Sequence, residues 1–182
     1  MKPLLNDLLK WCLMLEGPLD PEKGLWLWGN VGTGKSTMLE IVRQYCRRVR
    51  PPVSYRDPDC PRMMRSDKLA YGFRISNMNY VTGEYARLGY PGLREYIDTC
   101  RQAFDEVGRE NTQTGYFGNV ENVFQYIIQR RYDLRHGDFT HVTTNLRPEE
   151  IGPLYGDHIY DRCREMFNFV EMPGATFRKG QV

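Results

Sequence analysis

A glycine-rich stretch near the beginning of the chain contains residue types that bind phosphate. Residues 25–36 read LWLWGNVGTGKS, with the spacing G-x-x-x-x-G-K-[ST] at Gly29, Gly34, Lys35 and Ser36. Glycines let successive backbone N–H groups turn inward around an anion, and a helix that follows adds the positive end of its dipole. The lysine can reach the β- and γ-phosphates of a nucleotide, and the serine hydroxyl can ligate Mg²⁺.

The alternative is a glycine turn that happens to precede a helix. An apolar strand pattern before the loop and a helical pattern after it favour a nucleotide-binding loop instead. We therefore expect Ser36 to be a metal ligand, and we expect ATP and Mg²⁺ to bind through Gly29, Asn30, Val31, Gly32, Thr33, Gly34, Lys35, Ser36 and Thr37.

Hydrolysis of a bound nucleotide also needs a carboxylate for the metal and a base for the attacking water. The pair Asp105-Glu106, at the end of a short predicted strand, supplies both. We expect Asp105 to hold the Mg²⁺ shell and Glu106 to orient and activate the water. Acidic pairs at strand ends are common, and Arg101 and Gln102 interrupt the apolar pattern of this strand. The position of the pair, two helices and a strand after the phosphate loop, favours the catalytic interpretation.

Asn145 directly follows the next predicted strand. Its side chain could hydrogen-bond the γ-phosphate and the attacking water. The alternative is a plain turn residue after a strand, a position that asparagine favours in any case.

Helical and strand patterns alternate along the chain. Besides the helix after the phosphate loop, which Pro51-Pro52 ends, apolar spacing predicts helices over 4–15, 82–88, 93–98, 120–136 and 157–166. Strand patterns cover 25–28, 69–75, 100–104, 139–144 and 167–171. Turns or loops are expected at 53–67, 89–92 and 108–118. This alternation indicates a parallel α/β sheet.

The composition is that of an ordinary globular domain. Hydrophobic residues make up 41% and charged residues 26% of 182 residues, which suits one domain with a sizeable core. A net charge of +2 says nothing by itself about nucleic acid. Five cysteines without a CxxC pair argue for reduced thiols, and no apolar run is long enough to span a membrane. We expect a cytoplasmic protein without a membrane partner.

The order of these pieces resembles the AAA+ ATPases, and among them the DnaC/IstB-like helicase loaders and transposition ATPases of bacteria and phages. The resemblance covers about residues 24–178 and rests on the phosphate loop, Asp105-Glu106, Thr143-Thr144-Asn145, the segment 155–163, and Arg178. It implies an α/β, three-layer P-loop fold, with a parallel sheet flanked by helices and without a C-terminal helical lid. Residues 24–182 would form the ATPase domain, and residues 1–23 a helix and loop packed on it.

The resemblance also implies roles for single residues. Asn145 matches sensor 1, and Arg178 resembles the late arginine of sensor 2. Arg162 matches the arginine that such proteins insert into a neighbouring subunit's site, where it would stabilise transition-state charge. The plain alternative for Arg162 is an ion pair with Asp161 or Glu165 on the same helix.

An arginine supplied in trans implies a head-to-tail homo-oligomer. The family further implies DNA and a replicative helicase or a transposase as partners. About two dozen residues precede the first predicted strand, however, which is too few for the helicase-binding domain of a full loader.

Three functions are consistent with the sequence. The leading one is an ATP-hydrolysing AAA+ protein acting in DNA replication or transposition. The alternative is a P-loop kinase of a small molecule or nucleotide, whose substrate lid could be the arginine-rich segment 53–65. The third is a nucleotide-dependent scaffold with little or no turnover. Glu106 and Asn145 favour the first, because both suit a water nucleophile.

Overall fold

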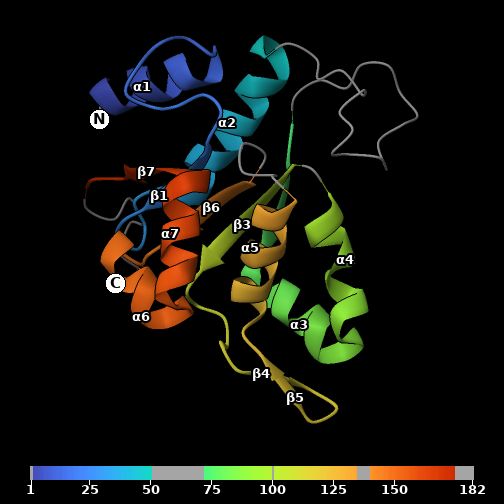
Figure 1. Cartoon of the computed structure of the whole chain (residues 1–182). Helices are drawn as coiled ribbons and strands as arrows, with labels where there is room; N and C mark the ends of the chain where they lie inside the picture. Colours follow the sequence, from blue (N-terminus) through green and yellow to red (C-terminus); the bar gives the residue numbers. More distant parts are fainter. Residues whose placement is uncertain (1, 51–71, 100, 135–139, 175–182) are drawn as a thin grey trace, which may run out of the picture.

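The computed structural model describes residues 2–50, 72–99, 101–134 and 140–174 (Figure 1). At its centre lies a five-stranded sheet in the order β2-β3-β6-β1-β7, in which neighbouring strands run parallel. The strands are β1 (Gly24–Trp28), β2 (Arg74–Asn77), β3 (Gln102–Val107), β6 (Thr140–Thr144) and β7 (Phe167–Glu171). The carboxyl ends of all five strands therefore lie at one edge of the sheet.

Helices cover both faces of this sheet. One core is shared with α1 (Lys2–Cys12) and α2 (Lys35–Val49). The core on the other face is shared with α3 (Met78–Leu88), α4 (Tyr90–Asp98), α5 (Val123–Asp133), α6 (Ile151–Tyr155) and α7 (Asp157–Met166). A short 3₁₀ helix, Pro148–Glu150, precedes α6. The predicted three-layer α/β architecture with a parallel sheet is confirmed.

The strand β1 shows why two separate cores form. Successive side chains of a strand point to opposite faces of the sheet. Leu25 and Leu27 are fully buried on the face of α1 and α2, whereas Trp26 is fully buried on the face of α3 and α5. A strand that is covered on both faces reads as a continuous apolar run, and LWLW is such a run.

The N-terminal helix α1 is attached to the sheet layer through Trp11. This residue is fully buried, and its indole Nε1 donates hydrogen bonds of 3.0 Å to the backbone oxygens of Asp20 and Lys23. The guanidinium of Arg50, which follows α2, lies 3.9 Å from the centre of the Trp11 ring. Trp11 therefore connects α1 to the loop before β1 and to the end of α2.

The prediction of a turn at 89–92 was wrong. Gly89 alone separates α3 from α4, and it adopts φ +65°. The helix α4 begins at Tyr90 and has Pro91 in its first turn. Proline is tolerated there, because the first N–H groups of a helix have no partner within the helix.

The segment predicted as a loop at 108–118 contains a β-hairpin instead. Its strands are β4 (Thr114–Tyr116) and β5 (Asn119–Glu121). The two-residue turn, Phe117-Gly118, has positive φ at both positions, as a type I′ turn requires. Val120, predicted to begin the next helix, belongs to β5 and is exposed. The mostly polar composition of this hairpin gave no alternating apolar signal.

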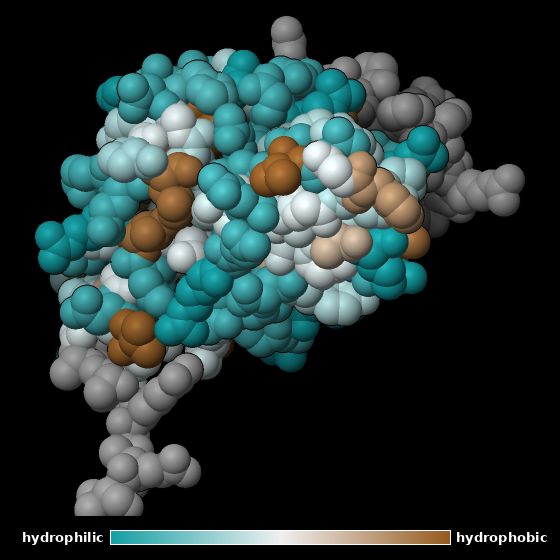
Figure 2. Space-filling view, turned by 90° about the horizontal axis from the view of Figure 1, so that it is seen from below, coloured by the Kyte–Doolittle hydropathy of each residue, from teal (hydrophilic) through white to brown (hydrophobic). Residues whose placement is uncertain are grey.

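The hairpin projects from the lower end of the molecule in Figure 1. The Phe117 side chain at its tip is 91% exposed. Seen from below, hydrophobic side chains form separate spots in a mostly hydrophilic surface (Figure 2). None of the helices in the described ranges is both long and apolar enough to cross a membrane.

Some predictions fall outside the described residues. These are the connection at 53–67, Arg178, the first residues of the strands predicted at 69–75, 100–104 and 139–144, and the last residues of the helix predicted at 120–136.

Candidate nucleotide-binding site

A pocket of about 280 Å³ opens at the carboxyl edge of the sheet, where open α/β sheets bind ligands. It is lined by Val31, Gly32, Gly34, Lys35, Ser36, Thr37, Glu106, Arg109, Thr143, Thr144 and Asn145. These residues come from the loop after β1 and the first turn of α2, from β3 and the turn that follows it, and from the end of β6 and the residue after it. The fold thus brings the phosphate loop together with Glu106 and Asn145, although these segments are far apart in the sequence.

Glycines give the phosphate loop its shape. Gly29, Gly32 and Gly34 have φ values of +143°, +82° and +84°. A Cβ atom on Gly29 would lie 2.6 Å from the backbone oxygen of Met172, so the segment after β7 packs directly against the loop. Gly34 precedes α2 and provides no side-chain cap. The first N–H groups of α2 are therefore donors that a phosphate can satisfy.

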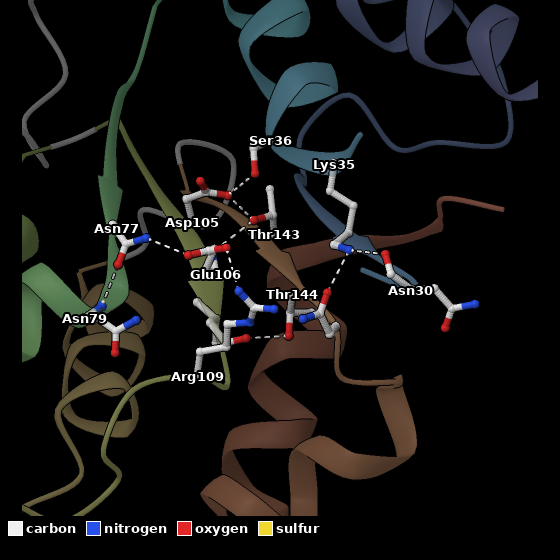
Figure 3. A network of polar contacts seen from close by, with 12 residues as sticks. Asn30, Lys35, Ser36, Asn77, Asn79, Asp105, Glu106, Arg109, Thr143 and Thr144 are labelled. Carbon is white, nitrogen blue, oxygen red and sulfur yellow. Dashed lines mark hydrogen bonds and ion pairs between the residues drawn. The ribbon is translucent and has the colours of Figure 1, made fainter. Parts of the chain in front are cut away.

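Lys35 is mostly buried and turns back over the loop. Its Nζ donates to the backbone oxygen of Gly29 at 2.8 Å and to Oδ1 of Asn145 at 2.8 Å. It also donates to the backbone oxygen of Asn30 at 2.7 Å (Figure 3). All three acceptors are neutral oxygens. The anionic oxygens of a triphosphate bind an ammonium group more strongly, so Lys35 can exchange these contacts for a phosphate.

Asp105 lies beside Ser36 and Thr143. Its Oδ1 accepts a hydrogen bond of 2.8 Å from the Ser36 hydroxyl and another from the Thr143 hydroxyl. A carboxylate and a hydroxyl are the hard oxygen donors that Mg²⁺ prefers, and this ion keeps waters and substrate phosphates as its other ligands. No group of three or more His, Cys, Asp and Glu side chains in the described ranges could hold a metal. With one carboxylate and one hydroxyl, the donor set at Ser36 and Asp105 fits Mg²⁺ bound together with a nucleotide.

The acidic pair lies within β3, at a β-bulge, and not after the strand as predicted. β3 pairs regularly with β6 up to Phe104, and the register then shifts before Val107. Glu106, inside this irregular segment, has φ +62°, which residues other than glycine rarely adopt. Its backbone N–H donates to the Thr143 hydroxyl at 3.1 Å. Because a bulge redirects side chains, both carboxylates reach the site from one strand.

Two residues that sequence reasoning missed hold the Glu106 carboxylate. Oε2 accepts a hydrogen bond of 3.0 Å from Nδ2 of Asn77, and Oε1 forms a 2.9 Å ion pair with Nη1 of Arg109 (Figure 3). Asn77 is the last residue of β2, and its Oδ1 caps α3 by accepting from the N–H of Asn79 at 2.9 Å. Asn77 falls between the predicted strand at 69–75 and the predicted helix at 82–88, so no sequence pattern singled it out. Arg109 belongs to no motif.

Arg162 lies on α7 and does not line the pocket. Its guanidinium is 5.1 Å from the centre of the Tyr132 ring, and its buried Nη1 has no hydrogen-bond partner among the described residues. The ion pair considered with Asp161 or Glu165 is not formed between these described side chains. The Glu165 carboxylate instead accepts a hydrogen bond of 2.6 Å from the Tyr132 hydroxyl.

No protein-family model and no curated protein matches this sequence. Its fold, by contrast, is similar to solved structures. The crystal structure of DnaI superposes with a TM-score of 0.64 and 17% identity, covering 97% of this chain and 84% of that one. The DnaC helicase loader gives 0.59 and 16%, covering 93% and 88%. AMPPCP-bound DnaA from Aquifex aeolicus gives 0.54 and 15%, covering 93% of this chain but 45% of that one.

Structural similarity at 15–17% sequence identity shows a shared fold. Three observations support this shared fold. They are the parallel sheet, the glycine loop between β1 and α2, and the coverage of most of the DnaC and DnaI chains. The chain therefore has the α/β fold, with a parallel sheet between helices, of the DnaC helicase loader and DnaI structures.

Proposed function

We propose that the protein binds ATP with Mg²⁺ in the pocket at the carboxyl edge of its sheet and hydrolyses it. The observation that carries this proposal is that Glu106 and Asn145 line the same pocket as the phosphate loop. A loop alone binds nucleotide. A carboxylate and an amide beside it provide groups that can hold and deprotonate water next to a phosphate.

Each residue of the site then has a role. Lys35 and the loop amides hold the phosphates, while Ser36 and Asp105 hold Mg²⁺. When bound, the ion neutralises phosphate charge and orients the phosphates. Glu106 orients the water and accepts its proton, and Asn145 positions the water against the γ-phosphate. Thr143 fixes the geometry of β3 through its hydrogen bonds to Asp105 and to the backbone of Glu106.

The nucleoside part of ATP needs further room. A second pocket of about 440 Å³ adjoins the phosphate loop. Its lining consists of Trp28, Gly29, Asn30, Arg147, Glu149, Glu171, Met172, Pro173 and Gly174. We place the ribose and base in this pocket, since it shares Gly29 and Asn30 with the loop.

Hydrolysis is favoured over transfer to a kinase substrate by the sheet order. β6 lies between β1 and β3, so Thr143 and Asn145 stand between the phosphate loop and the acidic pair. Polar groups thus surround the position in front of the phosphates, which suits a small nucleophile such as water. The arginine-rich segment 53–65, on which the kinase alternative rests, lies outside the described residues.

The cellular role is proposed from the resemblance and from the fold neighbours. DnaC is named a helicase loader, and one DnaA structure, with a TM-score of 0.54, is bound to AMPPCP and single-stranded DNA. We propose a cytoplasmic AAA+ ATPase of replication or transposition that assembles head to tail, contacts DNA, and serves a replicative helicase or a transposase. Residues 24–182 are its ATPase domain, residues 1–23 pack on it, and Arg162 and Arg178 complete the catalytic set.

One experiment separates the candidate functions. Phosphate and ADP release are measured in parallel with and without single-stranded DNA. An ATPase releases both in equal amounts, a kinase releases ADP without phosphate when its acceptor is present, and a scaffold releases neither. DNA binding is measured at increasing salt, because phosphate contacts weaken as counterions compete. An absence of DNA binding at low salt with ATP present would contradict the DNA part of the proposal.

A further inference from the structure

Arg109 is a cation at the edge of the candidate site. It lies three residues after Glu106 and lines the pocket together with the phosphate loop and Asn145. Its Nη1 is 2.9 Å from Oε1 of Glu106, and its side chain is 40% exposed. Figure 3 shows its guanidinium directed at the Glu106 carboxylate, on the side away from Ser36.

Several contacts hold the backbone of the turn that contains Arg109, whereas one contact holds the end of the Arg109 side chain among the described residues. Its N–H donates to the backbone oxygen of Glu106 at 3.3 Å, and the N–H of Gly108 donates to Oε2 of Glu110 at 2.7 Å. A Cβ atom on Gly108 would lie 2.6 Å from the Leu146 side chain, so this turn packs closely against the segment after β6. The guanidinium itself is held in the described residues by one ion pair, to Glu106.

This ion pair does little for stability. Both side chains are more than one third exposed, at 40% and 35%, and solvent screens an ion pair of this kind so that it adds little to the free energy of unfolding. A phosphate offers Arg109 a stronger partner, because a guanidinium binds phosphate oxygens through two parallel hydrogen bonds and the γ-phosphate carries more charge than one carboxylate oxygen. Glu106 and a γ-phosphate in the same pocket therefore compete for Arg109.

We propose that Arg109 is a γ-phosphate-binding residue that leaves Glu106 for the phosphate when ATP binds. The inference rests on the proposed nucleotide site and specifies how that site distinguishes ATP from ADP. In the structure both carboxylate oxygens of Glu106 have partners, Asn77 and Arg109. Departure of Arg109 frees Oε1 to accept a proton from water while Asn77 keeps the carboxylate in place. ADP has no γ-phosphate and leaves the ion pair intact.

The test compares the affinities of a non-hydrolysable ATP analogue and of ADP, measured by calorimetry with Mg²⁺. Arg109→Gln should weaken analogue binding by about 10-fold or more, as expected for lost charge-assisted hydrogen bonds, and leave ADP affinity within about 2-fold. Arg109→Lys should restore part of the loss. The matched control is Arg87→Gln, because Arg87 also pairs with a glutamate three residues away, Glu84 at 2.8 Å, and lies outside the pocket. It should change neither affinity.

The opposite results are equally clear. An unchanged ratio of analogue to ADP affinity in Arg109→Gln would overturn the inference, whether both affinities stay the same or fall together. Phosphate release should also fall in Arg109→Gln, and a rise would mean that Arg109 only restrains Glu106, which overturns the phosphate contact. An unchanged melting temperature shows that the variant is folded. If wild-type protein bound neither nucleotide, the proposed function would fail first, a result distinct from all of these.

Discussion

The ammonium group of Lys35 donates a 2.8 Å hydrogen bond to Oδ1 of Asn145, which joins the phosphate loop to the end of β6. A nucleotide phosphate that enters the pocket would replace Oδ1 of Asn145 as the hydrogen-bond acceptor of the Lys35 ammonium group. The Asn145 side-chain amide would then be available to the γ-phosphate and the water. In the proposed mechanism, binding of the phosphates and positioning of the water are therefore linked through Lys35.

Removing this lysine tests the binding site directly. Lys35→Ala should weaken ATP binding by roughly 10- to 100-fold, since it deletes charge-assisted contacts to the phosphates. Calorimetry with Mg²⁺-ATP measures the change. Lys10→Ala, which removes an exposed lysine on α1, is the control and should bind like wild type. Equal ATP affinity in Lys35→Ala and wild type would contradict the assignment of the loop.

Glu106→Gln separates binding from hydrolysis. The glutamine keeps the size of the side chain but cannot accept a proton from water. We expect ATP binding to persist and phosphate release to fall by about 10²- to 10⁴-fold, the range typical for loss of a general base. Single-turnover hydrolysis is the measurement. Turnover at the wild-type rate would identify a different residue as the base.

Arg162 is predicted to act on a neighbouring subunit. Its Nη1 is buried and has no hydrogen-bond partner among the described residues, and it lies on α7 outside the pocket of its own chain. Turnover per subunit should rise with protein concentration, because more sites then acquire an arginine. Arg162→Ala should keep ATP affinity and lose turnover by up to ~10³-fold. Arg164→Ala, two residues further along the same helix, is the control.

A mixing experiment decides whether Arg162 acts in trans. Arg162→Ala chains carry an intact Lys35 and Glu106, and Glu106→Gln chains carry an intact Arg162. Mixed assemblies should regain phosphate release at interfaces where each chain supplies what the other lacks. If the chains co-assemble and the mixture stays as inactive as its components, the residue does not complete a neighbour's site.

His141 should make stability depend on pH. Its side chain is fully buried beside Trp11 and Phe73, and burial lowers its pKa from 6.5 to about 3. Between these values the unfolded chain binds a proton that the native chain excludes. The stabilisation is complete above about pH 6.5 and is lost at up to ~1.4 kcal/mol per pH unit as the pH falls toward 3. Urea unfolding at pH 7 and pH 5 should show a smaller loss for His141→Leu than for wild type. Identical losses would contradict the prediction.

Arg131 is predicted to hold α4, α5 and β6 together. Its fully buried guanidinium donates to the Thr140 hydroxyl and to the backbone oxygens of Tyr96, Ile97 and Thr99. Arg131→Met leaves several of these buried acceptors without a donor, which should lower the free energy of unfolding by at least about 3 kcal/mol. Arg130→Met, at the exposed neighbouring position, should change it by less than about 0.5 kcal/mol. Thermal or urea unfolding of both variants provides the comparison, and similar values for the two would show that Arg131 is dispensable.

The sequence by itself determined the elements that depend on local pattern. LWLW predicted β1, the glycine spacing predicted the loop that follows, and the helix at 157–166 and the strand at 167–171 were found with the predicted bounds. The sequence also predicted that Asp105-Glu106 and Asn145 lie at the ends of strands. These features follow from residues that are close together in the chain, where propensity and periodicity act.

The tertiary structure alone decided how the site is assembled. The bulge that directs Asp105 and Glu106 depends on the pairing of β3 with β6, and Asn77 reaches Glu106 because β2 lies beside β3. Arg109 lines the pocket because the turn after β3 directs its side chain there. The hairpin at 114–121 was missed because its short strands have no apolar pattern of their own. β4 is held by contacts with α3, and β5 pairs with β4. Contacts between distant segments depend on sheet order and register, which no local window of the sequence contains.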